Sequence, residues 1–182
     1  METEFEAVDT IQRTVNAAQA LSSDQPEKLT SQVSLPTPPP PTAVVYCEGN
    51  FAKIDGKTAN GLVRHSQAYR ILSVIDSMHD GSDSGQVLGD VANHIPILSS
   101  LEAAIVHGVT VPNTMIYGMA PSTGKLSPTD RGVVLDAISL GMNIVSGLHE
   151  YLSDDPEISD FANVQGVTIR DIRRPKPSKD MR

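Results

Sequence analysis

The chain has a single cysteine, Cys47, and no tryptophan, and aromatic residues make up only 4% of its 182 residues. One cysteine excludes an intramolecular disulfide and a thiolate zinc cluster, and it favours a reducing compartment, so we expect a cytoplasmic protein. Because aromatics are scarce, the core must be built from Val, Ile, Leu, Ala and Met. Such a core suits helices packed on a sheet.

Long apolar runs and basic clusters are also missing. No run approaches the roughly 20 apolar residues that a membrane helix needs, and the acidic start Met1–Glu4 differs from a signal or transit peptide. The formal net charge is -8, and no Lys/Arg cluster with interleaved aromatics is present. We therefore expect neither a membrane nor a nucleic acid as partner. The histidines form no spaced pair of the zinc-binding kind, so no metal is expected.

The first 42 residues differ in composition from the rest. They end in LPTPPPPT, residues 35–42, which favours extended polyproline geometry and predicts a spacer. Upstream, apolar residues at spacings of three and four predict an amphipathic helix over residues 5–22, either a mobile or weakly docked appendage or a helix that binds a partner. Residues 1–42 are therefore expected to be a flexible acidic tail, disordered or loosely helical.

From residue 43 the chain alternates strand-like and helix-like segments. This pattern predicts an α/β fold, a three-layer Rossmann-like domain over residues 43–172 with a mostly parallel sheet of about six strands. The expected strands are 43–47, 70–75, 94–98, 114–117, 143–145 and 167–172, with 43–45 and 114–116 at the centre. The expected helices are 58–65, one capped by Ser99 or Ser100, one from Pro128 to a terminator at Gly141, and one through Val164 capped by Asp154 or Asp155. Residues 173–182 read as a basic, Pro-containing linker to a C-terminal domain outside this sequence.

Four of the expected strands stop abruptly at polar, glycine-containing loops. The loops cover residues 48–58, 76–86, 118–125 and 146–151. In doubly wound sheets ligands bind outside the carboxyl ends of the strands. The sequence therefore predicts a ligand site built from these four loops.

Phosphate-binding motifs are present only in part. Gly56-Lys57-Thr58 resembles the end of a P-loop, but that motif needs glycine at position 51, where this chain has Phe51. The same phenylalanine breaks a Gly-x-Gly-x-x-Gly fingerprint. A looser role for Lys57 and its helix N-terminus in holding an anion remains open. Asp76 stands where a dinucleotide fold places its ribose-binding acid, and the alternative is that it only caps the following turn.

The candidate site residues come from the same loops. His79 and His149 are the candidate catalytic residues, for acid–base chemistry or for holding an anion, the alternative being surface histidines that only form hydrogen bonds. Cys47 is either a strand-end nucleophile or a buried core residue. The candidate cofactor-binding residues share a position in or next to these loops: Glu48, Gly49, Asn50, Lys57, Thr58, Asp76, Ser77, Gly81, Gly118, Pro121, Gly124 and Gly147.

Five segments occur in the order of one known family: EGNFAKIDGKTANGLVR, SVIDSMHDGSDSGQVLG, IPILSSLEAA, IYGMAPSTGKLSP and IVSGLHEYLSDDPE. Over residues 43 to about 175 the chain resembles the N-terminal Rossmann-like domain of the D-glutamate N-acetyltransferase family, long described as a domain of unknown function. The resemblance implies a following P-loop-type domain with its own phosphate-binding loop. It also implies transfer of an acetyl group from acetyl-CoA to the amine of D-glutamate.

Three functions of different classes remain open at this stage. The first is the nucleotide- or CoA-binding part of an N-acetyltransferase, with acetyl-CoA as co-substrate. The second is an NAD-linked oxidoreductase, and the third is a non-catalytic binding or regulatory module. The expected partners are nucleotide and amino-acid ligands, a second copy in a homo-oligomer, and a separate chain that supplies the P-loop-type domain.

Overall fold

The computed structural model describes residues 38–108 and 110–175. The predicted helix over residues 5–22, residues 35–37 of the Pro-rich spacer and residues 176–182 of the predicted linker lie outside the described residues. Within the described part, no helix combines the length and the apolar character needed to cross a membrane.

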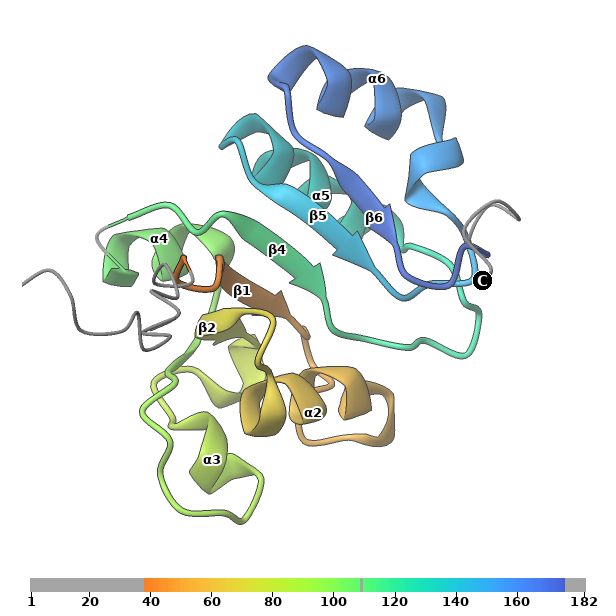
Figure 1. Ribbon diagram of the computed structural model, residues 1–182. Helices are drawn as coiled ribbons and strands as arrows, with labels where there is room; N and C mark the ends of the chain where they lie inside the picture. Colours follow the sequence, from red (N-terminus) through yellow and green to blue (C-terminus); the bar gives the residue numbers. More distant parts are fainter. Residues whose placement is uncertain (1–37, 109, 176–182) are drawn as a thin grey trace, which may run out of the picture. The chain divides into compact units, whose positions relative to one another are not determined.

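In the described residues, six strands alternate with five α-helices and three short 3-10 helices (Figure 1). The elements run in this order: β1 Thr42–Tyr46, η1 Ile54–Gly56, α2 Lys57–His65, β2 Arg70–Ile75, η2 Ser77–His79, α3 Ser84–Val87, β3 Ile97–Leu98, α4 Leu101–Gly108, β4 Thr114–Tyr117, α5 Pro128–Ser139, β5 Asn143–Ser146, η3 Leu152–Asp154, α6 Pro156–Gln165 and β6 Ile169–Asp171.

The strands form one parallel sheet in the order β3-β2-β1-β4-β5-β6. Helices α2 and α3 cover one face of the sheet, and α4, α5 and α6 cover the other (Figure 1). This is the strand order of a dinucleotide-binding fold. The predicted Rossmann-like α/β class and the parallel sheet of about six strands are confirmed, and the two strands expected at the centre, β1 and β4, are central neighbours.

The central strands are buried on both faces, which explains their uninterrupted apolar sequences. Val44 and Val45 point to opposite faces of β1, and neither exposes any surface. Beside them, Met115 of β4 is also fully buried. The small aliphatic core inferred from the composition is therefore the core of this sheet.

The predicted helix caps are present. Ser127 Oγ accepts a hydrogen bond from the Asp130 amide at 3.1 Å, and Pro128 occupies the first turn of α5. Of the two candidates before α6, Asp155 is the cap, since its Oδ1 accepts from the Ile158 amide at 3.1 Å. Ser100 caps α4 by accepting from the Ala103 amide at 3.1 Å. Each cap satisfies an amide that has no partner within its own helix.

The third strand is shorter than the predicted 94–98, because His94 has a φ of 60° and cannot continue an extended strand. Asp83 holds this turn by accepting from the His94 amide at 2.7 Å. Residues 81–84 then run antiparallel to residues 95–97, with the Gly81 amide donating to the Ile97 carbonyl at 2.9 Å. This pairing covers the edge of β3, and the short helix α3 follows it without having been predicted. The last strand, β6, is likewise shorter than the predicted 167–172.

Candidate functional site

The carboxyl ends of the parallel strands bring the four predicted loops to one edge of the sheet. The chain leaves β1 for α2 on one face and leaves the neighbouring β4 for α5 on the other (Figure 1). A crevice at such a switch point is the usual ligand site of an open α/β sheet. We call this side of the sheet the strand-end edge and describe it from β2 to β6.

Asp76, at the end of β2, is completely buried. Its Oδ1 accepts hydrogen bonds from the amides of Gly49 and Met78, both at 3.0 Å. Its Oδ2 accepts from the Phe51 amide at 3.1 Å and contacts His79 Nδ1 at 3.0 Å. A buried carboxylate with four partners is a structural hub, and no ligand hydroxyl reaches it in this arrangement. Capping of the turn, the alternative to ribose binding, is what the geometry supports.

His79 takes its orientation from Asp76. Because the carboxylate accepts a hydrogen bond, Nδ1 is the donor, and in the neutral ring the opposite nitrogen, Nε2, carries the lone pair. The side chain is 30% exposed, whereas that of Asp76 is fully covered. A buried carboxylate that holds a partly exposed imidazole is the arrangement of a general base with its orienting acid. Of the two histidines proposed from sequence, His79 has the geometry of a base.

Glu48 and Ser77 join the loops that follow β1 and β2. Glu48 Oε2 accepts from the Ser77 amide at 2.9 Å, and Oε1 accepts from the Ser77 hydroxyl. Asn50 Nδ2 donates to the Glu48 carbonyl at 2.8 Å and lies 3.3 Å from Met119 Sδ. Contacts among these four residues therefore join the loops after β1, β2 and β4 at one edge of the sheet.

The start of α2 is covered by the loop that follows β4. The Ala59 amide, in the first turn of α2, donates to the Gly118 carbonyl at 3.1 Å, and the Ala120 amide donates to the Asp55 carbonyl at 2.9 Å. A side chain at position 118 would place its Cβ 2.6 Å from Val45 Cγ1, so only glycine allows this approach. Lys57 and Thr58 are exposed at the same helix start. The hydrogen bonds between the loop after β4 and the start of α2 leave less space for a phosphate at the N-terminus of that helix.

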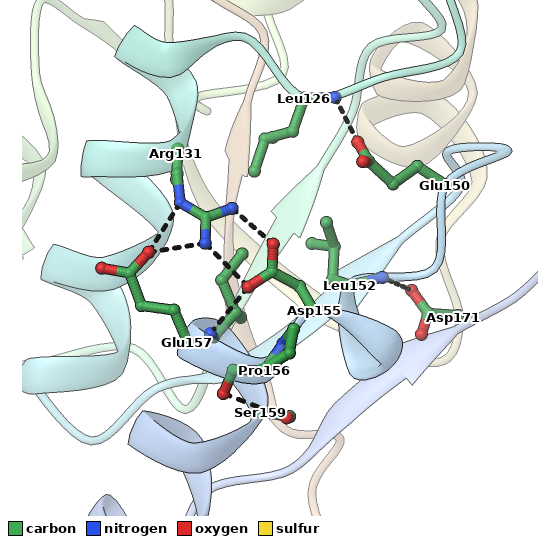
Figure 2. A network of polar contacts seen from close by, with 10 residues as sticks. Leu126, Arg131, Glu150, Leu152, Asp155, Pro156, Glu157, Ser159 and Asp171 are labelled. Atoms are coloured by element: carbon green, nitrogen blue, oxygen red, sulfur yellow. Dashed lines mark hydrogen bonds and ion pairs between the residues drawn. The ribbon is translucent and has the colours of Figure 1, made fainter.

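The loops after β4 and β5 meet at Gly124, whose φ is 66°. Its carbonyl accepts from the amides of His149 and Glu150, each at 3.1 Å. Glu150 in turn accepts from the Leu126 amide at 3.0 Å (Figure 2). Of the remaining predicted residues, Pro121 accepts from the Gly124 amide at 2.8 Å. Gly147 packs next to Ile172, because a Cβ there would lie 3.4 Å from Ile172 Cδ1.

The other candidates occupy different environments. His149 Nε2 lies 3.1 Å from Arg173 Nη1, so this nitrogen accepts a hydrogen bond and is not available as a base. Gly81 lies apart from the crevice, on the segment that covers the edge of β3. Burial raises the pKa of the Cys47 thiol to about 12, with the nearby Asp76 and Glu48 carboxylates adding to the effect. Cys47 is therefore a protonated core thiol, and the geometry does not support a nucleophilic role.

Sequence reasoning missed a cluster of two tyrosines and one aspartate. Tyr46 and Tyr117 are register partners on β1 and β4, with ring centroids 5.8 Å apart. Their hydroxyls donate to the two oxygens of Asp130 at 2.7 and 2.9 Å. Burial, and then the hydrogen bond to Asp130, raises the pKa of both phenols well above its ordinary value. The signal available in the sequence was an aromatic at the end of two neighbouring strands and an acid in the first turn of α5.

A second network fixes α5 against α6 (Figure 2). The Arg131 guanidinium forms paired hydrogen bonds of 2.7 Å to both oxygens of Asp155 and also contacts Glu157 at 2.6 Å. This pairing holds the pKa of the Asp155 carboxyl down at about 2. Nearby, Asp171 at the end of β6 accepts from the amides of Leu152 and Ser153, each at 3.0 Å. These contacts hold the loops after β5 and β6 in place at the strand-end edge.

Comparison with known proteins agrees with this fold. Two curated relatives, each named D-glutamate N-acetyltransferase, come from Tritonibacter scottomollicae and a Pseudoalteromonas species. They are 36% and 37% identical to this chain over 62 residues. The matched segment is 34% of this chain and 19% of each relative's length. The chain therefore spans only a small part of these relatives.

Solved structures show the same architecture. A DUF1611 family protein from Anabaena variabilis superposes with a TM-score of 0.65 at 28% identity, over 75% of this chain and 38% of that protein. An amine dehydrogenase from Mycobacterium smegmatis gives a TM-score of 0.51 at 18% identity, over 70% of this chain and 38% of that protein, and this likeness concerns the fold alone.

A family profile extends the sequence match. The profile of the domain of unknown function DUF1611_N, described as a Rossmann-like domain, matches residues 77–175, which is more than half of the chain. The resemblance inferred from the five sequence segments is thus confirmed, and the chain belongs to the DUF1611_N family of Rossmann-like domains.

Proposed function

We propose that this Rossmann-like domain supplies the strand-end edge of an N-acetyltransferase site. In this reaction the amine of D-glutamate attacks the thioester carbonyl of acetyl-CoA, an N–C bond forms, the C–S bond breaks, and the CoA thiol leaves. The names of the curated relatives support this chemistry. The contact between His79 and Asp76 is the observation that carries the assignment of a base.

His79 removes the proton that the nitrogen loses on acylation. Its Nε2 has the lone pair because Asp76 fixes the proton on Nδ1, and the ring is accessible while the carboxylate is not. The proton therefore moves from the amine to Nε2 and from there to the departing CoA thiolate. In between, the imidazole is a cation next to a buried carboxylate. That neighbour stabilises the cation, as the aspartate does in hydrolytic triads.

The ligand-contact residues that we propose lie in the loops after β1 and β2 or at the start of α2. Ser77, Lys57 and Thr58 are exposed, and Glu48, Gly49 and Asn50 are partly covered. Asp76 acts through His79 and the loop amides, so it is a positioning residue and not a ligand contact. The family resemblance places further phosphate contacts in a P-loop-type domain, and part of the acyl-donor site belongs there in this proposal.

Calorimetric titration with acetyl-CoA, CoA and NAD tests the ligand class. Acetyl-CoA binding that is weakened by Lys57→Ala supports the proposal and places the ligand at the strand-end edge. Binding of NAD alone would replace it with the NAD-linked oxidoreductase. Binding of none of the three would favour the non-catalytic module.

A pair of histidine variants tests the base. Transfer of acetyl from acetyl-CoA to D-glutamate is followed by mass spectrometry, with the chain alone and with a protein that supplies the P-loop-type domain. We expect His79→Gln to lower kcat by about 10²- to 10⁴-fold, the usual contribution of a general base, with little change in KM. His65→Gln, which alters an exposed histidine in the last turn of α2, is the matched control. Equal kcat values for His79→Gln and wild type would remove His79 from the mechanism.

A further inference from the structure

We propose that Arg173 and His149 form a subsite for one anionic group, a phosphate or a carboxylate, of the ligand that occupies the strand-end edge. The inference rests on the proposed function only in taking this edge to be the ligand site. Of the two roles that the sequence leaves open for His149, acid–base chemistry and anion holding, the subsite uses the second.

Three loops converge where these two residues lie. The Ile172 amide, directly before Arg173, donates to the Ser146 carbonyl at 2.9 Å and so continues the pairing of β5 with β6. The His149 amide donates to the Gly124 carbonyl at 3.1 Å, which attaches the loop after β4. The two side chains thus come from the carboxyl ends of the neighbouring strands β5 and β6. The loop after β4 packs against the His149 imidazole through Gly124.

The orientation of His149 is fixed by a glycine. A Cβ at position 124 would lie 2.9 Å from His149 Cδ2 and 3.0 Å from its Cβ, so the ring packs directly on the backbone of Gly124. Nε2 faces the Arg173 guanidinium at 3.1 Å. Arginine has no acceptor, so Nε2 must accept, and the ring is neutral with its proton on Nδ1. The Nδ1–H group points away from Arg173, so His149 orients the guanidinium, and the contacts to the anion come from the remaining guanidinium donors.

Arg173 differs from the other arginines described at the loops and helix ends. Arg64 pairs with Asp90 at 2.6 Å, and Arg174 pairs with Asp154 while stacking on Tyr151, with 4.5 Å between Cζ and the ring centroid. Within residues 38–108 and 110–175, Arg173 has no carboxylate within 4.0 Å, and its side-chain partner is the uncharged imidazole. A guanidinium carries five N–H donors in a planar fork that matches carboxylate and phosphate oxygens. One donor is used by His149, and the others remain for an anion.

The position of Arg173 and His149 in the sheet favours a phosphate over a carboxylate as the bound anion. Arg173 follows β6 and His79 follows β2, and these strands are four places apart in the sheet. At roughly 4.8 Å between neighbouring strands, the two residues are about 19 Å apart along the edge. One amino-acid substrate is too short to contact both. A long acyl donor can place its thioester near His79 and a phosphate near Arg173.

The test is a titration followed by NMR of the histidine ring nitrogens. Inorganic pyrophosphate and glutarate are added separately to the wild-type chain, to Arg173→Gln and to Arg170→Gln. Arg170 is exposed on β6, so its variant loses the same charge a few residues away and serves as the control. We expect pyrophosphate to shift the His149 ring signals, with an affinity at least tenfold weaker in Arg173→Gln and less than twofold weaker in Arg170→Gln.

Each outcome of the titration either supports the anion subsite or overturns it. A response to glutarate in place of pyrophosphate supports the subsite but assigns it to a carboxylate. Equal loss in both variants would show attraction by net charge alone and overturn the subsite, as would unshifted ring signals at millimolar anion. The titration needs no acetyl transfer, so the two proposals fail separately. Anion binding at Arg173 in a chain whose activity is unaffected by His79→Gln would keep this subsite and remove the proposed base.

Discussion

Replacing Asp76 with asparagine tests the central contact of the strand-end edge, because the change removes a charge and almost no volume. The amide oxygen of asparagine can keep the two hydrogen bonds that Oδ1 accepts from Gly49 and Met78. The amide nitrogen then replaces Oδ2 and faces the Phe51 amide and His79 Nδ1, which both carry protons in the wild type. The asparagine NH2 group, the Phe51 amide and His79 Nδ1 are all donors, so no hydrogen bond forms between them.

His79 can resolve one of these conflicts and Phe51 cannot. If the imidazole moves its proton to Nε2, Nδ1 accepts from the asparagine amide and the contact survives. The Phe51 amide has no such alternative, and its residue is fully buried. An unsatisfied buried amide costs about 1 to 3 kcal/mol, and the lost charge-assisted hydrogen bond adds about 1 kcal/mol or more. We therefore expect the free energy of unfolding to fall by about 2 to 4 kcal/mol.

Urea unfolding followed by circular dichroism measures this difference. For a domain of this size the same change corresponds to a Tm lower by about 10 °C. Asp80→Asn is the control, since Asp80 is exposed and lies four residues after Asp76, and changes at such positions usually stay within about 0.5 kcal/mol. Equal stability of Asp76→Asn and Asp80→Asn would refute the conclusion that Asp76 is the hub of these loops.

The same variant has a separate consequence for activity. The tautomer that rescues the contact puts the proton on Nε2, so the ring can no longer accept a proton from the amine. Where acetyl transfer is measurable, kcat should fall about as far as in His79→Gln, even at temperatures at which Asp76→Asn is fully folded. A folded Asp76→Asn with normal kcat would contradict the role of Asp76 in orienting the base.

Two further predictions concern stability. Gly118→Ala should lower the free energy of unfolding by about 1 to 3 kcal/mol, because the added Cβ would lie 2.6 Å from Val45 Cγ1. Urea unfolding of this variant that matches wild type would contradict the close approach. Arg131→Gln should cost about 1 kcal/mol at pH 7, a value reduced for partial exposure, since the Arg131 and Asp155 side chains are 31% and 24% exposed. Pairing lowers the folded-state pKa of Asp155 to about 2, so its stabilisation is present above pH 4, near the unfolded pKa, and is lost as the pH falls toward 2. Urea unfolding at both ends of that range should show the difference between variant and wild type shrinking on acidification, and a constant difference would refute the assignment.

The fold was largely predictable because its signals are local. The buried parallel strands read as short apolar runs, and the starts of α5 and α6 carry a capping side chain followed by proline. The boundary of the third strand was not predictable in the same way. His94 adopts a positive φ because Asp83, eleven residues earlier, holds its amide, and no pattern within residues 94–98 indicates that contact.

The site was predictable in location and less so in roles. Loops that follow adjacent parallel strands must meet, so the edge could be placed from the ends of the apolar runs alone. Roles depend on contacts between residues distant in sequence. His79 and His149 look alike as loop histidines, and only their partners, Asp76 for one and Arg173 for the other, separate the proposed base from the proposed anion-binding residue.

Internal contacts at this edge occupy the groups that dinucleotide-binding folds reserve for pyrophosphate. There, the amides of the first strand–helix loop and the start of its helix hold the phosphates. Here, Asp76 accepts from the Gly49 and Phe51 amides, and the Gly118 carbonyl accepts from the Ala59 amide. A carboxylate that already fills the anion position repels a second anion. The amides of Gly49, Phe51 and Ala59 are therefore not free for the phosphates of a dinucleotide, which argues against the oxidoreductase. The exposed Lys57 and an anion subsite farther along the edge remain for the phosphates of an acyl donor.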